Sequence, residues 1–458
     1  MPTLNPKRPS RAIHQNPDNA MSPFDPQLQA PAPAQADQAA LAAIASAQAA
    51  QAVHAANGWR ALMQRVSGQL PDIAAFAFAL VTASLAAVLL ASLPGCGGGV
   101  GSEGTGSYAS GTISGYGSII VNGVHFTETT AVVKDDDDQV FDSASLGLGM
   151  VVQITGGPIS TAADGSSQAV ASTIRTQRAL VGPVSAVNAG TGQITVLGQT
   201  VTVSSATWFD GRIAGGLAAI TTGQWLAIYG FYNSGTTSFN ATRIALSGPS
   251  AGPRVSGPVG AIDAQAKTFK LGSQTYSFAA LGSTAAANSQ VTLKLQSAAH
   301  DDADGNWVVS GEKTTESPPQ DRDGAEVDGV VSTVLSVSRF VVNGVTVDSS
   351  AARVSGTVLA GARVEASGTL RAGVLVANQI QASATTASKT FELNGTLSSL
   401  DTVNRRFVLR ATTVSYAGAV FNNFNAAKLV GYTGKLKVKG MVSGDGTLLA
   451  ASSIQFSD

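Results

Sequence analysis

The sequence predicts an all-β protein built from five small tandem modules, each folded as a closed barrel or as an open, sandwich-like sheet. Only 12% of the residues are charged, 6% are aromatic and Gly occurs 50 times, a composition typical of many short strands joined by tight turns. A triplet of large apolar residues at positions i, i+2 and i+7 recurs five times along the chain. A disordered N-terminal segment and one hydrophobic helix are expected to precede these modules.

The five apolar triplets mark a hairpin in each module. They are Ile119/Val121/Phe126, Ile194/Val196/Val201, Phe269/Leu271/Tyr276, Phe340/Val342/Val347 and Phe407/Leu409/Val414. In the first and fourth copies the pairs Asn122-Gly123 and Asn343-Gly344 stand between the apolar residues. Asn-Gly between alternating apolar residues predicts a two-residue type I′ turn. Such a turn puts each triplet on one face of the hairpin, so we expect every triplet to be buried.

The remaining strand signals follow each hairpin in the same order. A second strand ends in Gly, and a closing strand reads "ASTIR", "ATRIA", "ANQIQ" or "ASSIQ"; the third copy departs from both patterns. Four or five strands per copy suit a small barrel, whose closure removes exposed sheet edges. Because units of this size are marginally stable alone, we expect them to stack on one another.

These signals divide the chain into segments. The predicted segments are a disordered Ala/Gln/Pro-rich leader (1–62), a signal sequence or membrane helix (63–95), a Gly/Ser tether (96–110), module 1 (111–178), module 2 (179–250), module 3 (253–316), a linker (317–325), module 4 (326–384) and module 5 (388–458). The linker "TESPPQDRDG" is expected to act as a hinge between modules 1 to 3 and modules 4 and 5.

The segment before the tether indicates export. Arg60 and Arg65 precede 73–93, an uncharged apolar run long enough to span a bilayer as a helix. Residues 93–96, Leu-Pro-Gly-Cys, resemble the lipobox of bacterial lipoproteins, which implies that Cys96 is lipidated and becomes the new N-terminus. Gly97 then implies an outer-membrane lipoprotein facing the periplasm or the surface. The alternative is an uncleaved inner-membrane helix, and translation starts at Met1 or Met63.

Catalytic signals are weak in this sequence. A single cysteine excludes an intrachain disulfide and a Cys-based zinc site, and the stretch 95–106 lacks the order of a phosphate-binding loop. No G-x-S-x-G motif stands in a strand-turn-helix context. His125 is expected to be a solvent-facing strand residue, and His300 is the other histidine that follows Cys96. The sequence therefore predicts a non-catalytic protein without a cofactor.

Two acidic stretches are weak candidates for metal binding. Asp135 to Asp138 form a run that we interpret as a solvated acidic loop. In "DDADGN", Asp302 and Asp304 stand near Gly305 somewhat as in a calcium loop, but the twelve-residue pattern is incomplete. A polar hairpin turn is the favoured interpretation there, and no metal site is predicted.

A basic strand in module 5 is the main candidate binding surface. In "GKLKVKG", Lys435, Lys437 and Lys439 alternate with apolar residues, so a strand puts the three ammonium groups on one face. Further candidates nearby in sequence are Arg405, Arg406 and Arg410, with Phe421, Phe424 and Tyr432 available for stacking. This set predicts a groove for a polyanion or an oligosaccharide; the alternative is a plain solvated face.

Charge and family resemblance complete the expectations. The formal net charge of -1 does not favour nucleic acid, but module 1 is acidic and module 5 basic, which favours head-to-tail self-association. The export signal, the "VNG" turns, "LGLGMVVQITG" and the A-x-x-I strands resemble a bacterial envelope family classed as a domain of unknown function, over 111 to about 457. This resemblance implies small OB-like barrels, a location in the cell envelope and no catalytic residue. We therefore expect a binding or spacer scaffold in the envelope, and the candidate ligands are a protein and a polysaccharide.

Overall fold

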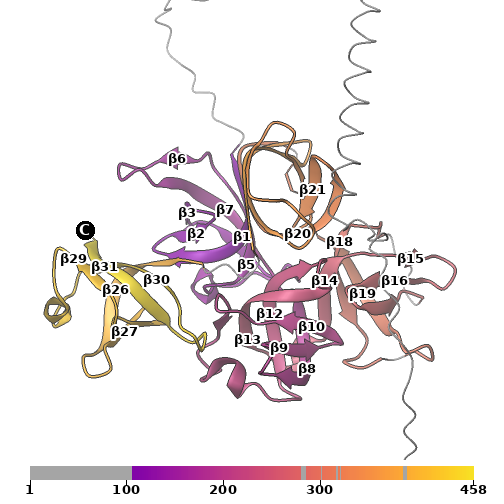
Figure 1. Cartoon of the computed structure of the whole chain (residues 1–458), viewed down its shortest axis with the longest axis horizontal. Coiled ribbons are helices and arrows are strands. Elements are labelled where there is room, and N and C mark those ends of the chain that lie inside the picture. Colours follow the sequence, from indigo (N-terminus) through magenta and orange to yellow (C-terminus); the bar gives the residue numbers. More distant parts are fainter. Residues whose placement is uncertain are drawn as a thin grey trace, which may run out of the picture. The chain divides into compact units, whose positions relative to one another are not determined.

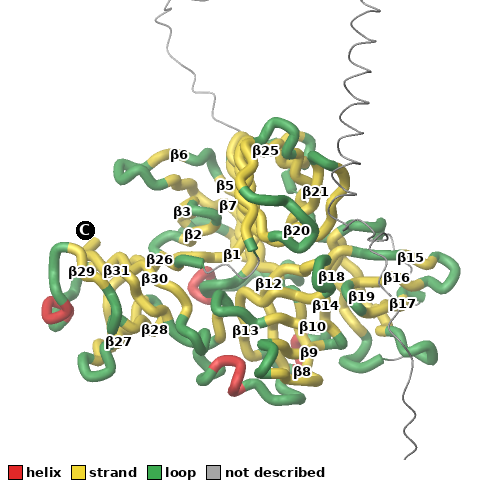
Figure 2. The backbone as a smooth tube through the Cα atoms, in the orientation of Figure 1, coloured by secondary structure: helices red, strands yellow, loops and turns green. Residues whose placement is uncertain are grey.

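A computed structural model describes residues 106–279, 285–300, 302–315, 318–319, 321–384 and 389–457. The predicted leader, the apolar run and Cys96 lie outside the described residues. Within the described ranges, no helix is long and apolar enough to cross a membrane. Figure 2 shows strands and loops over nearly all of this part of the chain, with helix confined to a few short turns.

The strands follow the five predicted modules. Module 1 has β1 (Ser107–Tyr116), β2 (Ile119–Val121), β3 (Val124–Thr127), β4 (Val132–Lys134), η1 (Ser143–Ser145), β5 (Val151–Gly156), β6 (Ser160–Thr161) and β7 (Ser167–Gln177). Module 2 has β8 (Leu180–Asn188), β9 (Gln193–Val196), β10 (Gln199–Thr202), β11 (Trp208–Phe209), η2 (Gly216–Ala219), β12 (Trp225–Asn233) and β13 (Ser238–Leu246), and η3 (Pro249–Ala251) follows it.

The other three modules repeat this order. Module 3 has β14 (Arg254–Pro258), β15 (Ile262–Asp263), β16 (Thr268–Leu271), β17 (Gln274–Ser277), β18 (Gln290–Leu295) and β19 (Trp307–Thr314). Module 4 has β20 (Arg322–Ser336), β21 (Arg339–Val342), β22 (Val345–Asp348), β23 (Arg353–Ser355), β24 (Arg363–Arg371) and β25 (Val374–Ser383). Module 5 has β26 (Phe391–Asp401), β27 (Arg406–Leu409), β28 (Thr412–Ser415), β29 (Val420–Asn422), η4 (Ala426–Leu429), β30 (Lys435–Val442) and β31 (Leu449–Ser457).

Strand pairing closes each module into a barrel. In module 2, β8 pairs antiparallel with both β9 and β12, β9 with β10, and β12 with β13, while β10 pairs parallel with β13. Modules 1, 4 and 5 repeat the same circuit. Module 3 divides its first strand into β14 and β15. The predicted all-β, OB-like barrel class is therefore confirmed.

The hairpins form as the Asn-Gly pairs predict. Asn122 and Gly123 have φ of 54° and 80°, and Asn343 and Gly344 have φ of 52° and 79°. The turns align Ile119 with Phe126, as the two-residue turn requires. Every residue of the five triplets is at most 3% exposed, so the predicted burial is confirmed. Burial of one such side chain contributes about 1.5–3 kcal/mol, which makes the triplets a main source of stability.

First strands also join modules to one another. β1 pairs parallel with β20 over Ser107–Ser110 and with β26 at Gly115 and Tyr116, and Figure 1 shows β1 beside β20. β8 pairs with β14, which joins modules 2 and 3. Stacking thus includes modules that are not neighbours in sequence.

Two predicted boundaries need correction. β1 begins at Ser107, inside the predicted tether 96–110, and β20 begins at Arg322, inside the predicted linker 317–325. The start of β1 pairs with β5 and β20, and the start of β20 pairs with β24 and β1. These pairings satisfy backbone groups that a linker would leave to water. The last three residues of the predicted hinge, 322–324, are therefore part of a strand.

Candidate functional site

The lysine row of module 5 lies on β30 as the alternation predicts. Leu436 and Val438 are fully buried, whereas Lys435 and Lys439 are exposed and Lys437 is half-buried between them. The ammonium groups therefore stand on the outer face of the barrel, opposite the core.

A carboxylate that the sequence analysis missed already occupies this face. Glu392 on β26 receives Lys437 Nζ at 2.8 Å on Oε1 and Lys439 Nζ at 3.2 Å on Oε2. Burial raises the pKa of Glu392, but the hydrogen bonds and charges of both lysines outweigh it, and the pKa is lowered. Glu392 is thus a resident anion, and an incoming polyanion must compete with it for two of the three lysines.

The three candidate arginines do not share one site. Arg410 follows β27 at the hairpin turn, and its Cγ lies 3.3 Å from where a Cβ on Gly395 would stand. Gly395 pairs with Leu436, whose side chain faces the core, so this approach does not put Arg410 on the lysine face. Arg410 Nη1 lies 3.9 Å from Glu128 Oε1 of module 1. Arg406 pairs with Asp401 at the opposite end of β27, and Arg405 precedes it. The two ends of β27 are roughly 10 Å apart in an extended strand, which separates Arg405 and Arg406 from Arg410.

The aromatic candidates stack on each other. The rings of Phe424 and Phe456 are stacked with centroids 3.9 Å apart, and Tyr432 stacks on Phe456 at 4.2 Å. Phe421 meets Phe424 edge to face at 5.0 Å. The hydroxyl of Tyr432 also donates to the carbonyl of Lys435 at 3.0 Å. Much of the face of each half-buried ring is therefore covered by another ring of this group. The sequence analysis did not single out Phe456.

The Asp302 loop uses its carboxylate to hold a turn. Asp302 Oδ1 accepts the backbone N–H groups of Asp304 at 3.1 Å and Asn306 at 2.6 Å, and Oδ2 accepts Asn306 Nδ2 at 2.9 Å. Gly305 has a φ of 74°. This geometry supports the polar-turn interpretation of the Asp302 and Asp304 pair.

The acidic run 135–138 is not a solvated loop, and that interpretation is wrong. Asp136 is buried and accepts both Nε and Nη2 of Arg178, and it lies 3.3 Å from Arg254 Nη1. Arg254 Nη1 also donates to Asp137 Oδ2 at 2.6 Å.

Module 3 supplies further cations to the same run. Lys294 Nζ lies 2.6 Å from Asp137 Oδ1, and Lys313 Nζ lies 2.5 Å from Asp138 Oδ2. Arg175 of module 1 also pairs with Asp138. We call residues 135–138 and these five cations the acidic clamp, which joins module 1 to module 3. Carboxylates of Asp135, Asp136 and Asp137 lie within 4.8 Å of one another, but with the paired cations they form an ionic junction.

A second charged junction surrounds Asp328, which the sequence analysis did not single out. Asp328 on β20 is fully buried, and its Oδ2 receives Arg363 Nη2 and Lys389 Nζ, each at 2.7 Å. The hydroxyl of Thr112 on β1 donates to the same oxygen at 3.2 Å. Burial raises the pKa of Asp328, but the charges and hydrogen bonds of Lys389 and Arg363 lower it to about 2. This Asp328 cluster joins modules 1 and 4 to the segment that leads into module 5.

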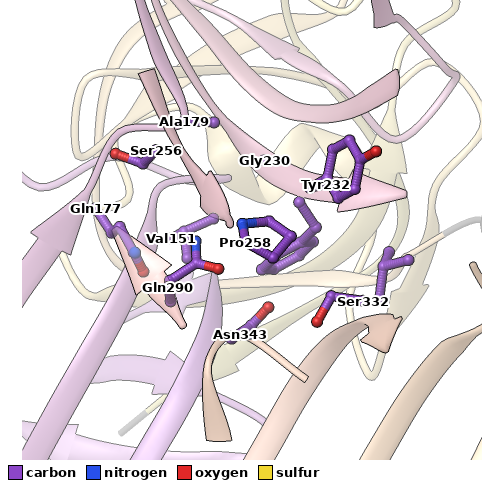
Figure 3. Close-up of a pocket in the computed structure, with 12 residues that line it drawn as sticks. Val151, Gln177, Ala179, Gly230, Tyr232, Ser256, Pro258, Gln290, Ser332 and Asn343 are labelled. Atoms are coloured by element: carbon purple, nitrogen blue, oxygen red, sulfur yellow. The ribbon is translucent and has the colours of Figure 1, made fainter. Parts of the chain in front are cut away.

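A small cavity lies where modules 1 to 4 meet (Figure 3). Its volume is about 30 Å³, and its polar lining includes Gln177, Ser256, Gln290, Ser332 and Asn343. Such a volume accommodates water but is far below the 300–1,000 Å³ typical of ligand pockets. The cavity is therefore a feature of the module junction.

Comparison with known protein families gives a match in two of the modules. A family model described as "Domain of unknown function (DUF5666)" matches residues 181–245 and 328–381. These segments cover most of module 2 and of module 4. A search of curated proteins gives no match. Modules 2 and 4 therefore each match the DUF5666 family model, and the structure shows the OB-like barrel that each of them forms.

Proposed function

We propose that this protein is a non-catalytic scaffold of the bacterial cell envelope, which holds five OB-like barrels as one body on a lipid anchor at Cys96. The observation that carries the proposal is the sharing of β1, which pairs with β20 of module 4 and β26 of module 5. A chain of barrels on flexible linkers would need none of these pairings.

Contacts between other modules support the same proposal. Thr242 of module 2 donates its hydroxyl to the carbonyl of Gly149 in module 1 at 2.7 Å, and Arg243 Nη1 donates to Leu148 O at 3.0 Å. The N–H of Phe209 donates to Gly446 O of module 5 at 2.8 Å. Trp208 packs edge to face on Phe391 with centroids 5.4 Å apart. Fixed spacing between barrels suits a spacer or a platform for binding.

The anchor is tested by the mass of the protein isolated from membranes. We expect loss of residues 1–95 and a diacylglyceryl adduct on Cys96, with Cys96→Ala as the control that is neither modified nor cleaved. A full-length, unmodified chain in the membrane fraction would contradict the lipid anchor and favour the uncleaved helix.

A second candidate function is anionic-polymer binding by module 5. It is favoured by the exposure of Lys435 and Lys439 and opposed by Glu392, which pairs with Lys437 and Lys439. Heparin chromatography tests it. Glu392→Gln should strengthen salt-sensitive retention, and replacement of Lys435, Lys437 and Lys439 by Glu should abolish it. Absence of retention at low salt, for both the unmodified chain and Glu392→Gln, would dismiss this function.

A further inference from the structure

Module 2 carries a polar hollow on its outer face. Its volume is about 470 Å³, and it is formed by β9, β10, the start of β13 and the loop between β12 and β13. The lining residues are Gln193, Thr200, Thr202, Ser204, Asn233, Thr236, Ser238 and Asn240. Each of these side chains ends in a hydroxyl or a carboxamide, and none of them is charged or aromatic.

The position of the hollow in the barrel matches a binding face. In the strand order of module 2, β9 and β10 are the second and third strands of the circuit, and the loop 234–237 joins the fourth strand to the fifth. OB-like barrels bind oligonucleotides and oligosaccharides on this face and with this loop. The volume falls in the range of small-molecule sites.

Comparison of the five modules shows that one lining residue is unusual. The parallel pairing of the third and last strands places Asn240 opposite Thr202. The residues at this register in the other modules are Val170, Val308, Val376 and Ala450. The barrel therefore folds with a small apolar residue at this position, and the fold does not require the carboxamide of Asn240.

The carboxamide nitrogen of Asn240 also lacks a partner. Its Nδ2 is buried and has no hydrogen-bond partner among the described residues. A buried donor that makes no hydrogen bond lowers stability, because it has lost water and gained nothing in return. Because Asn240 lines the hollow, a rotation of its side chain would bring this donor to the hollow, where a bound acceptor would restore the missing bond.

We propose that this hollow binds a neutral oligosaccharide. Sugar hydroxyls both donate and accept hydrogen bonds, which suits the mixture of Thr and Ser hydroxyls with Asn and Gln carboxamides. A polyanion gains nothing from a lining without cations, and a nucleic acid also lacks a ring on which its bases stack. The inference depends on module 2 alone and stands or falls separately from the scaffold proposal.

Binding is tested on the full chain by calorimetric titration with neutral tetrasaccharides, namely maltotetraose, cellotetraose, mannotetraose and chitotetraose. A heparin tetrasaccharide is the charged comparison. At least one neutral sugar should bind, and Asn240→Val and Thr200→Val should each weaken it about tenfold, the effect of one lost hydrogen bond. The matched control is Thr346→Val, which makes the same change at the equivalent register of module 4 and should leave the affinity unchanged.

A second measurement needs no ligand. Asn240→Val should raise the melting temperature, since it removes an unsatisfied buried donor and installs the residue found in three other modules. The proposal is overturned if none of the four sugars binds, if binding survives both Asn240→Val and Thr200→Val, or if the heparin tetrasaccharide competes. A lower melting temperature for Asn240→Val would also overturn it, because the carboxamide would then be satisfied within the protein.

Discussion

The Asp328 cluster and the acidic clamp are two charged junctions of opposite design. In the Asp328 cluster one fully buried carboxylate serves two cations, and Arg363 and Lys389 are themselves mostly covered. In the clamp four carboxylates meet five cations, but Asp138 is 49% exposed and its partner Lys313 is 38% exposed. The clamp has more ion pairs, whereas the ion pairs of the Asp328 cluster are less exposed to solvent.

This difference indicates that burial, rather than the number of ion pairs, decides how much each junction contributes to the stability of the fold. An exposed pair is worth about 0–1 kcal/mol, because water and salt screen it. Removing one partner of a buried pair costs about 3–5 kcal/mol, because the other charge stays buried and unpaired. The Asp328 cluster should therefore be the more sensitive junction, although it is the smaller one.

The largest expected effect is that of Asp328→Ala. It leaves Arg363 and Lys389 without their shared carboxylate, so the free energy of unfolding should fall by about 3–5 kcal/mol in denaturant titrations. Asp323→Ala is the matched control on the same strand, since Asp323 and its partner Arg371 are about half exposed, and it should cost at most about 1 kcal/mol. Equal losses of unfolding free energy in the two variants would contradict the conclusion that burial decides what an ion pair contributes.

Asp136→Asn should have the next largest effect. Asp136 is the most buried carboxylate of the clamp and accepts hydrogen bonds from both Arg178 and Arg254. Because the amide keeps part of that hydrogen bonding, we expect a loss of about 2–3 kcal/mol in the same titrations. A loss below that of Asp323→Ala would show that the buried end of the clamp behaves as surface.

Glu326 provides a pH-dependent test beside Asp328. It lies two residues away on β20, where burial and the charge of Glu365 raise its pKa to about 7. Since the folded state holds a proton that the unfolded state releases above about pH 4.5, this stabilisation is present at low pH and is lost as pH rises through 7. Unfolding free energy should fall on the order of 2 kcal/mol from pH 5 to 8.

The control for this effect is Glu326→Gln, which cannot titrate and should flatten the profile between pH 5 and 8. Asp328 has the opposite sign: its lowered pKa stabilises the fold above about pH 4, and the contribution is lost as pH falls toward 2. An unchanged profile in Glu326→Gln would show that another group titrates.

The smallest expected effect is that of Lys313→Ala in the clamp. Lys313 and Asp138 are both well exposed, so the loss should be about 0.5 kcal/mol at low salt and should vanish near 1 M salt. Denaturant midpoints at the two salt concentrations measure it. A loss that persists at high salt would mean that the exposed end of the clamp is less hydrated than its exposure indicates.

Local sequence signals were sufficient for the barrels. Asn-Gly turns and the spacing of apolar residues predict the hairpins and the buried triplets, because both depend on residues close in sequence. Contacts between distant segments carry no such signal. β1 pairs with β20 and β26, although these strands are far from it along the chain. Arg254 and Lys313, which pair with Asp137 and Asp138, are also distant in sequence.

The candidate sites show the same division. Arg405 and Arg410 are close in sequence, yet the hairpin separates them, and Glu392 enters the lysine row from another strand. Two features of the sequence do indicate residues that the sequence analysis did not single out. Asp328 interrupts an apolar strand, and alignment of the five modules sets Asn240 against small apolar residues.

The claim that the barrels form one body is tested most directly by a distance between modules 1 and 4. Spin labels can be placed at the exposed residues Val140 and Val337, as Val140→Cys and Val337→Cys in a Cys96→Ser chain. Pulsed dipolar spectroscopy should then give a single narrow distance distribution, because β1 and β20 share one sheet. A broad distribution, as flexibly linked barrels would give, would contradict the account.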